Sequence, residues 1–214
     1  MNTPLVVIVG TQSSGSSAIA GVAYHVGVWM GTDLGGRYGR NPNTRCGFED
    51  RTITRIVQRH VPFMRPRRGS ANVLRRSLTH RIRTLQQEAA SHGTIAGIKL
   101  PRLSFVGDIL LDLCGDGLRV IDCDRPLEDS IQSVKRRMPN NKNCERWQTW
   151  LWNGKHAFLA TVPEDRRLTV EYYATVRDPH TTAERITAFL GLSPTPEQMQ
   201  RAVAIIHPTM KHVG

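Results

Sequence analysis

A glycine- and serine-rich stretch near the start of the chain has the spacing of a phosphate-binding loop. The pattern is G-x-x-x-x-G followed by two hydroxyl side chains. It follows the apolar run Leu5–Val9, which predicts a buried strand, and it opens an apolar stretch that predicts a helix from Ser16 to Val26. Backbone N–H groups of such a turn, with the positive end of the helix, bind phosphate oxygens. The predicted anion site comprises Gly10, Thr11, Gln12, Ser13, Ser14, Gly15, Ser16 and Ser17.

The loop carries no lysine or arginine of its own. Ser16 stands where an ATP-using P-loop enzyme places the lysine that neutralises the β and γ phosphates. A nucleotide whose charge is held by residues outside the loop would not need that lysine. The serine-rich turn could also be a strand-to-helix connection that binds nothing.

Two further segments bring charged residues to the ends of predicted strands. The run "TIAGIKL" predicts a strand that ends near Lys99, and "LRVIDCD" predicts one from Leu118 to about Asp122, followed by Arg125. Ligands of parallel α/β sheets bind beyond the carboxyl ends of the strands. We therefore expect Lys99 and Arg125 to lie beside the loop, although a strand-end lysine could equally be an ordinary surface residue.

Candidate bases for activating a hydroxyl group follow a glycine-rich segment at 32–48. Glu49 and Asp50 stand in "GFEDR", and His25 lies on the helix after the loop. The plainer interpretations are an acidic residue at a helix start for Glu49 and a packed or exposed side chain for His25.

Strands and helices alternate along the chain, which predicts a parallel sheet with helices on both faces. We expect one domain over 1–214 with an α/β, three-layer P-loop fold: a central parallel sheet flanked by helices. The expected strands are 5–9, 94–100, 118–122 and 166–176. The expected helices are 16–26, 49–61, 72–92, 105–115, 125–138, 144–160, 179–191 and 195–206.

The composition favours anionic ligands. Lys and Arg number 29 against 18 Asp and Glu, a formal charge of +11, which attracts nucleotides, acidic glycans or nucleic acid. There is no apolar run of about 18 residues, so we expect no membrane span. Without a signal peptide and with cysteines expected to be free thiols, we expect a cytoplasmic protein. The four cysteines are Cys46, Cys114, Cys123 and Cys144.

The ordered set of motifs resembles the P-loop sulfotransferases. "GTQSSGSSAIAGVAYHVGVWMG" is similar to their loop, apolar helix and "LGV-x-MG" ending, and "EYYATVRDPHTTAERITAFLGL" is similar to their C-terminal Y-x-x-L-x-x-D-P helix with "FLGL". "GIKLPRL" resembles a G-x-K-x-P stretch of bacterial and phage-type members. The resemblance covers nearly the whole chain. It implies a sulfotransferase-like fold and 3′-phosphoadenosine-5′-phosphosulfate as the donor.

The same resemblance implies roles for individual residues. The loop from Gly10 to Ser17 would hold the 5′-phosphosulfate, and Arg125 with Ser133, eight residues later, would hold the 3′-phosphate. The family carries Arg or Lys at the position of Ser13, so another cation must assist the departing phosphate here. Lys99 is the candidate, and the loop-borne alternatives are Arg37, Arg40 and Arg45. Many members have Arg at the position of Asp124.

Three functions follow as alternatives. The first is transfer of a sulfonate to an acceptor hydroxyl, with Lys99, Glu49 and Asp50 as catalytic candidates. The second is a P-loop kinase that uses ATP with Mg²⁺ on a hydroxyl, including one on a nucleic-acid base, which Asp122 and Asp124 would favour. The third is a non-catalytic nucleotide- or nucleic-acid-binding protein. We expect 32–48 and 139–157 to shape the pocket for an anionic or hydroxyl-bearing acceptor, with Trp147, Trp150 and Trp152 mainly in the core.

Overall fold

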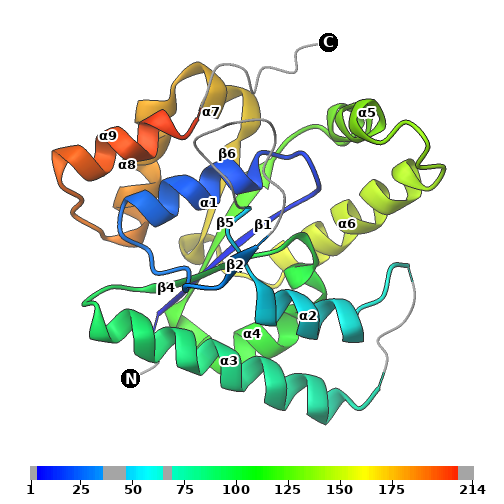
Figure 1. Ribbon diagram of the computed structural model, residues 1–214, viewed down its shortest axis with the longest axis horizontal. Helices are drawn as coiled ribbons and strands as arrows, with labels where there is room; N and C mark the ends of the chain where they lie inside the picture. Colours follow the sequence, from blue (N-terminus) through cyan, green and yellow to red (C-terminus); the bar gives the residue numbers. More distant parts are fainter. Residues whose placement is uncertain (1–3, 36–46, 65–68, 207–214) are drawn as a thin grey trace.

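A parallel four-stranded sheet lies at the centre of the computed structural model, which describes residues 4–35, 47–64 and 69–206 (Figure 1). The strand order is β4-β1-β5-β6, and every neighbouring pair is parallel. The strands are β1 (Leu5–Gly10), β4 (Ala96–Lys99), β5 (Leu118–Asp124) and β6 (Arg167–Glu171). The short strands β2 (Leu34–Gly35) and β3 (Glu49–Asp50) form a separate antiparallel pair. The expected three-layer α/β fold is confirmed.

Helices cover both faces of the sheet (Figure 1). One side carries α1 (Ser16–His25), α8 (Pro179–Leu190) and α9 (Pro196–Ala204). The other carries α2 (Arg51–His60), α3 (Ala71–Ser91), α4 (Gly107–Cys114) and α6 (Cys144–Leu159). The helix α5 (Leu127–Arg137) lies against α6, and α7 (Tyr172–Arg177) follows β6. Short 3₁₀ turns are η1 (Pro101–Val106), η2 (Gly115–Gly117) and η3 (Glu164–Arg166).

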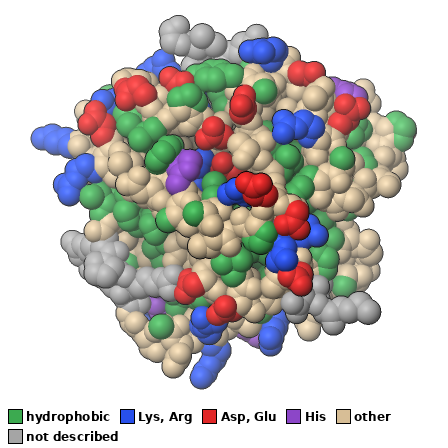
Figure 2. Space-filling view, turned by 180° about the vertical axis from the view of Figure 1, so that it is seen from behind, with side chains coloured by type: hydrophobic (Ala, Val, Ile, Leu, Met, Phe, Trp, Pro, Cys, Tyr) green, Lys and Arg blue, Asp and Glu red, His purple; other side chains and the backbone are tan. Residues whose placement is uncertain are grey.

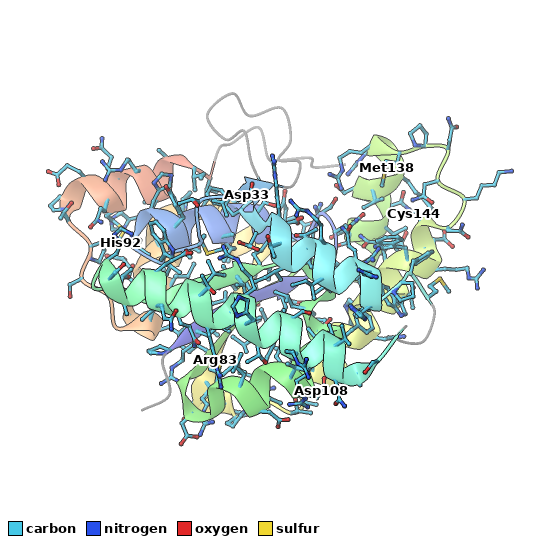
Figure 3. All side chains as sticks on the ribbon, turned by 60° about the horizontal axis from the view of Figure 1, so that its bottom comes forward. Asp33, Arg83, His92, Asp108, Met138 and Cys144 are labelled. Carbon is cyan, nitrogen blue, oxygen red and sulfur yellow. The ribbon has the colours of Figure 1, made fainter. Side chains whose placement is uncertain are left out.

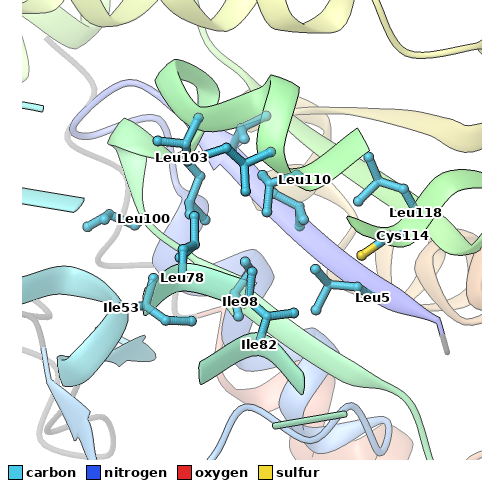
Figure 4. Close-up of a cluster of buried hydrophobic side chains, with 14 of the residues drawn as sticks. Leu5, Ile53, Leu78, Ile82, Ile98, Leu100, Leu103, Leu110, Cys114 and Leu118 are labelled. Atoms are coloured by element: carbon cyan, nitrogen blue, oxygen red, sulfur yellow. The ribbon is translucent and has the colours of Figure 1, made fainter. Parts of the chain in front are cut away.

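The central strand β1 is buried on both faces, which explains its continuous apolar sequence. Leu5, Val7 and Val9 point into the core under α3, α4 and η1, whereas Val6 and Ile8 point into the core under α1 and α8. Figure 4 shows Leu5 in the first of these clusters. Both cores therefore hold β1 in the register that places the following loop at the edge of the sheet.

The long helix α3 buries the stripe that its sequence predicts. Leu74, Leu78, Ile82 and Leu85 are at most 1% exposed, and Figure 4 shows Leu78 and Ile82 facing the sheet. Replacing one such leucine by alanine costs about 2–5 kcal/mol of stability. The polar side forms ion pairs: an Arg75 nitrogen lies 2.8 Å from an Asp112 oxygen, and Arg81 pairs with acidic residues described below.

The expected strand over 166–176 is wrong in its second half. The strand β6 ends at Glu171, and residues Tyr172–Arg177 form α7. The neighbouring strand β5 ends at Asp124, opposite Glu171, so no partner remains for a longer ladder. The Thr175 hydroxyl donates to the Glu171 carbonyl at 2.8 Å and so supports the first helical turn.

Smaller differences occur at other boundaries. The helix expected from residue 49 begins at Arg51, because Glu49 and Asp50 pair with β2 and Asp50 caps the helix. The strand expected to end near Asp122 continues to Asp124. Of the segment 32–48, residues 36–46 lie outside the described residues, and with them Arg37, Arg40, Arg45 and Cys46.

The described cysteines Cys114, Cys123 and Cys144 are buried free thiols, as expected. Burial raises the pKa of Cys114 to about 11, partly offset by a Gln86 hydrogen bond, and burial also raises the pKa of Cys123. On the face shown in Figure 2, described basic side chains are interspersed with acidic ones. Within the described ranges, no helix has the length and apolar character needed to cross a membrane.

Candidate anion-binding site at the carboxyl ends of the strands

The loop from Gly10 to Ser17 turns sharply between β1 and α1. Ser13 and Gly15 have left-handed backbone angles, with φ of 65° and 86°. Gly10 must lack a side chain because a Cβ there would overlap the Ser14 hydroxyl. Gly15 precedes α1, and no side chain caps this helix. The first N–H groups of α1 therefore remain available to an anion, as in other helix N-terminal phosphate sites.

The Ser14 side chain is the first sign that the loop is built for a ligand. It is 2% exposed, and its hydroxyl has no hydrogen-bond partner within the described part of the chain. An unpaired buried polar group costs about 1–3 kcal/mol of stability. An oxygen-rich anion seated on the loop would supply the missing acceptor.

Side chains from α5 and α6 hold the loop from behind. The Gln12 N–H donates to Gln148 Oε1 at 3.2 Å, and the Gln148 amide donates back to the Gln12 carbonyl at 2.7 Å. The Thr11 hydroxyl donates to the Ser130 hydroxyl at 3.2 Å. Gln148 and Ser130 are fully buried, so these contacts fix the loop from residues far along the sequence.

Lys99 reaches the loop from β4, as the sequence predicts. Its ammonium group donates to the Ser17 hydroxyl at 3.0 Å and lies 2.8 Å from Glu49 Oε1. Lys99 is 5% exposed. The pair brings a cation and a carboxylate together at the open end of the loop. Glu49 is thus a partner of Lys99 and part of the short strand β3, not a residue of the first turn of α2.

Asp50, the second candidate base, has structural partners on both oxygens. One oxygen accepts from the Ile53 N–H at 2.8 Å and caps α2, and the other lies 2.6 Å from an Arg81 nitrogen. Arg81 also pairs with Glu88 at 3.4 Å. Asp50 is 3% exposed, so its contacts orient β3 and thereby Glu49.

Arg125 reaches the opposite side of the loop from the end of β5. Its guanidinium donates to the Ser13 carbonyl at 2.8 Å and lies 4.1 Å from the centre of the Tyr172 ring. Arg125 is 3% exposed, and its Nε has no hydrogen-bond partner among the described residues. A desolvated guanidinium with a free donor is suited to a phosphate oxygen.

The helix α5 turns one polar face toward the loop. Ser130 and Ser133 are buried and one turn apart, and Arg137 follows one turn after Ser133. Arg137 donates to the Ser13 hydroxyl. Ser133 therefore lies on the same helical face as Ser130 and Arg137, which both contact the loop.

The acidic residues of β5 form ion pairs with α6. Asp122 and Asp124 lie 2.9 and 3.1 Å from the ammonium group of Lys155 on α6, which is 2% exposed. Burial lowers the pKa of Lys155, but the two carboxylates outweigh this effect and raise it. The carboxylates are thus balanced within the fold. In the described part of the chain, no three His, Cys, Asp or Glu side chains are grouped to hold a metal.

His25 lies far from these residues. It ends the ten-residue helix α1, about 15 Å from the loop at its other end. Burial and the charge of Arg201 lower its pKa. The structure therefore does not bring His25 to the candidate site.

The tryptophans of α6 extend the site region on the side of η1. Trp147 stacks on Phe63 and Trp150 on Phe105, with ring centres 4.2 and 4.0 Å apart. Trp150 also packs against the main core, whereas Trp152 contacts His156. The Arg102 guanidinium lies 5.0 Å from the Trp147 ring centre, and burial lowers its pKa.

Several residues of the site could not be identified from the sequence alone. Tyr172 lies in the segment expected to be a strand, and a Cβ on Gly15 would come within 2.9 Å of its ring. Gln148 and Lys155 are polar residues buried on an otherwise ordinary helix. Among these missed residues, Arg137 could have been found, since it stands four residues after Ser133 on a predicted helix.

Neither a protein-family model nor a curated protein sequence matches the chain. Solved sulfotransferase structures share its fold. The sulfotransferase domain of the olefin synthase of Synechococcus PCC 7002 has a TM-score of 0.59 at 18% identity, covering 97% of this chain and 85% of that one. Sulfotransferase STF1 from Mycobacterium tuberculosis has a TM-score of 0.60 at 16% identity, covering 95% and 71%. The sulfotransferase domain from the curacin biosynthetic pathway has 0.59 at 15%, covering 94% and 78%.

At such identities the likeness establishes the fold alone. The chain has the α/β P-loop fold of the sulfotransferases, over nearly all its length. What it binds must be argued from its own residues.

Proposed function

We propose that the protein is a sulfotransferase that moves a sulfonate from 3′-phosphoadenosine-5′-phosphosulfate to an acceptor hydroxyl. The observation that carries the proposal is the pair of anion sites on one loop. The backbone of residues 10–17 with Ser14 supports one anionic group. Arg125, 3% exposed and with an Nε that has no partner among the described residues, supports a second anionic group. A nucleotide with phosphates at both the 5′ and 3′ positions matches two such sites.

The proposed reaction is an in-line displacement at sulfur. The acceptor oxygen forms a bond to sulfur, and the bond from sulfur to the bridging oxygen breaks. The electron pair of that bond stays on the departing phosphate of adenosine 3′,5′-bisphosphate. The proton of the acceptor hydroxyl passes to the Glu49 carboxylate, and Lys99 stabilises the negative charge that grows on the bridging oxygen.

Lys99 and Glu49 are suited to these roles because they lie together at the loop. The ammonium group bridges the Ser17 hydroxyl and the Glu49 carboxylate at 3.0 and 2.8 Å. A proton gained by Glu49 would therefore be accompanied by a freer charge on Lys99 at the moment when the leaving oxygen needs it. Asp50 acts through position, because its contacts with Ile53 and Arg81 fix β3.

The kinase alternative has weaker support. The acidic residues that favour it, Asp122 and Asp124, are ion-paired with Lys155 on the far side of β5 from α1. Ser16 provides no charge for a γ phosphate. The geometry thus gives these carboxylates a structural role.

Calorimetry with adenosine 3′,5′-bisphosphate and with ATP plus Mg²⁺, side by side, tests the proposal. We expect the bisphosphate to bind at least tenfold more tightly, and the labelled sulfonate of the donor to be transferred to a member of a panel of hydroxyl compounds. Tighter binding of ATP with Mg²⁺ would favour the kinase. Binding of the bisphosphate without cleavage of the donor would leave a nucleotide-binding protein.

A further inference from the structure

We propose that Arg137 supplies, from α5, the positive charge that the phosphate loop lacks, and that it contacts the 5′ phosphate of the nucleotide. The inference rests on the proposed function and deepens it, because it assigns a residue to the leaving phosphate. The loop itself offers only neutral donors: backbone N–H groups and the hydroxyls of its serines. A departing phosphate gains negative charge, which a nearby cation must stabilise.

Two guanidinium groups converge on one loop residue. Arg125 donates to the carbonyl of Ser13, and Arg137 donates to its hydroxyl. Arg125 lies two residues before α5 and Arg137 is the last residue of α5, yet both side chains reach Ser13. Figure 3 labels Met138, which directly follows Arg137, and Cys144, where α6 begins.

No carboxylate balances this pair within the described ranges. The ion pairs of the molecule include Lys99, Lys135, Lys155, Arg75 and Arg81, but neither Arg125 nor Arg137. Burial and then repulsion by Arg125 lower the pKa of Arg137. Two cations held close together without a counter-ion repel each other, and this repulsion is relieved when each of them binds an anionic group. The buried, unpartnered Ser14 hydroxyl and Arg125 Nε lie in the same region and need acceptors.

The place that Arg137 reaches explains which phosphate it serves. A longer basic side chain at position 13 would extend beyond the Ser13 hydroxyl, where the Arg137 guanidinium lies. Arg137 thus does from α5 what a loop arginine could do from position 13. Lys99 contacts Ser17 at the other end of the loop, so the two cations flank the cradle formed by residues 13–17. The Arg137 residue as a whole is exposed although its guanidinium is partly desolvated, so a ligand can reach it.

Three adenosine phosphates distinguish the possible contacts. Adenosine 3′,5′-bisphosphate, AMP and adenosine 3′-phosphate are compared by competition calorimetry with wild type, Arg137→Ala and the matched control Arg136→Ala. Arg136 is exposed and carries the same charge in the same helical turn. We expect Arg137→Ala to weaken the bisphosphate and AMP by about tenfold or more and to leave adenosine 3′-phosphate within about threefold. Arg136→Ala should change all three by less than about threefold.

A swap of the charge provides the second test. In Arg137→Ala, the further change Ser13→Arg should restore the affinity for the bisphosphate, because it returns a guanidinium to the same place. Arg137→Lys should retain part of it. Both variants keep a cation at the site, so they also control for damage to the fold.

Three results would overturn the inference. Unchanged affinity in Arg137→Ala would mean that Arg137 only neutralises the carboxyl end of α5. Equal losses of affinity for all three ligands would mean that Arg137 acts through the general electrostatic potential and not through a contact with the 5′ phosphate. If wild type binds none of the three ligands, the proposed function fails and the inference with it. That failure is distinct, since it is seen before any residue is changed.

Discussion

The two sides of the phosphate loop hold their cations in opposite ways. On the side of Ser17, Lys99 lies 2.8 Å from Glu49 and its charge is balanced within the protein. On the side of Ser13, Arg125 and Arg137 both donate to Ser13, Arg125 also lies over the Tyr172 ring, and neither arginine forms an ion pair with a described carboxylate. The interaction between Lys99 and Glu49 can weaken during a reaction if Glu49 gains a proton. The unbalanced pair gains most from an anion that stays bound.

We infer from this difference that one side of the loop mainly binds the nucleotide and the other side mainly takes part in the reaction. We expect substitutions on the Ser13 side to lower nucleotide affinity, and substitutions on the Ser17 side to lower the rate of donor cleavage. A cation that is balanced by two carboxylates, such as Lys155, should affect neither directly and should act on stability. The following variants test each part of this comparison.

Lys155→Met should give the largest effect, on stability. Removing the ammonium group leaves the buried Asp122 beside Asp124 without a cation, which costs about 3–5 kcal/mol in the free energy of unfolding. Urea unfolding measures it. The control is Lys135→Met, which breaks the exposed pair with Glu145 and should leave the free energy of unfolding nearly unchanged. Equal costs for the two variants would show that Lys155 is not a buried counter-ion.

Arg125→Ala should weaken binding of adenosine 3′,5′-bisphosphate by about 100-fold, since hydrogen bonds to charged groups contribute about 1.5–3 kcal/mol. Calorimetry measures the affinity. Arg76→Ala, an exposed arginine on α3, removes the same formal charge and should change the affinity by less than about twofold. If Arg125→Ala binds as wild type does, Arg125 does not hold a phosphate.

Lys99→Ala should slow donor cleavage by about tenfold or more, because it removes the cation beside the leaving oxygen. The affinity for the bisphosphate should fall less than this rate, since the charge of Lys99 is already balanced by Glu49. Single-turnover release of labelled sulfonate gives the rate, and calorimetry gives the affinity. A rate equal to that of wild type would make Lys99 a structural residue.

Gln148→Ala should have the smallest effect of these variants on nucleotide binding. It should weaken binding at the Ser13 side and the Ser17 side of the loop alike. It removes two hydrogen bonds to the Gln12 backbone, so part of the loop must be ordered when the nucleotide binds. We expect about fivefold weaker binding of the bisphosphate, measured by calorimetry, with unchanged preference over ATP. Gln132→Ala, which breaks an exposed bond to Glu128 on α5, is the matched control. A loss in the control as large as in Gln148→Ala would argue against the loop clamp.

The sequence predicts those parts of the fold that depend on local pattern. The apolar run of β1 and the buried stripe of α3 appear as expected. The end of β6 could not be predicted from residues 166–176, because it depends on where the neighbouring strand β5 stops.

In the candidate site too, the features that depend on local sequence are predicted, and those that depend on tertiary packing are not. The loop, Lys99 and Arg125 are found from motifs and from the ends of strands. Lys155 and Gln148 are not, because their partners are more than thirty residues away in the chain and only the packing of α6 brings them together. The three-dimensional contacts also show that Asp50 and Glu49, adjacent in sequence, have different surroundings.

A crystal structure with adenosine 3′,5′-bisphosphate tests the central claim most directly. We expect the 5′ phosphate on the backbone N–H groups of residues 14–17 and the 3′ phosphate within hydrogen-bond distance of Arg125 and Ser133. A bisphosphate bound away from the loop, or with its 3′ phosphate far from Arg125, would contradict it.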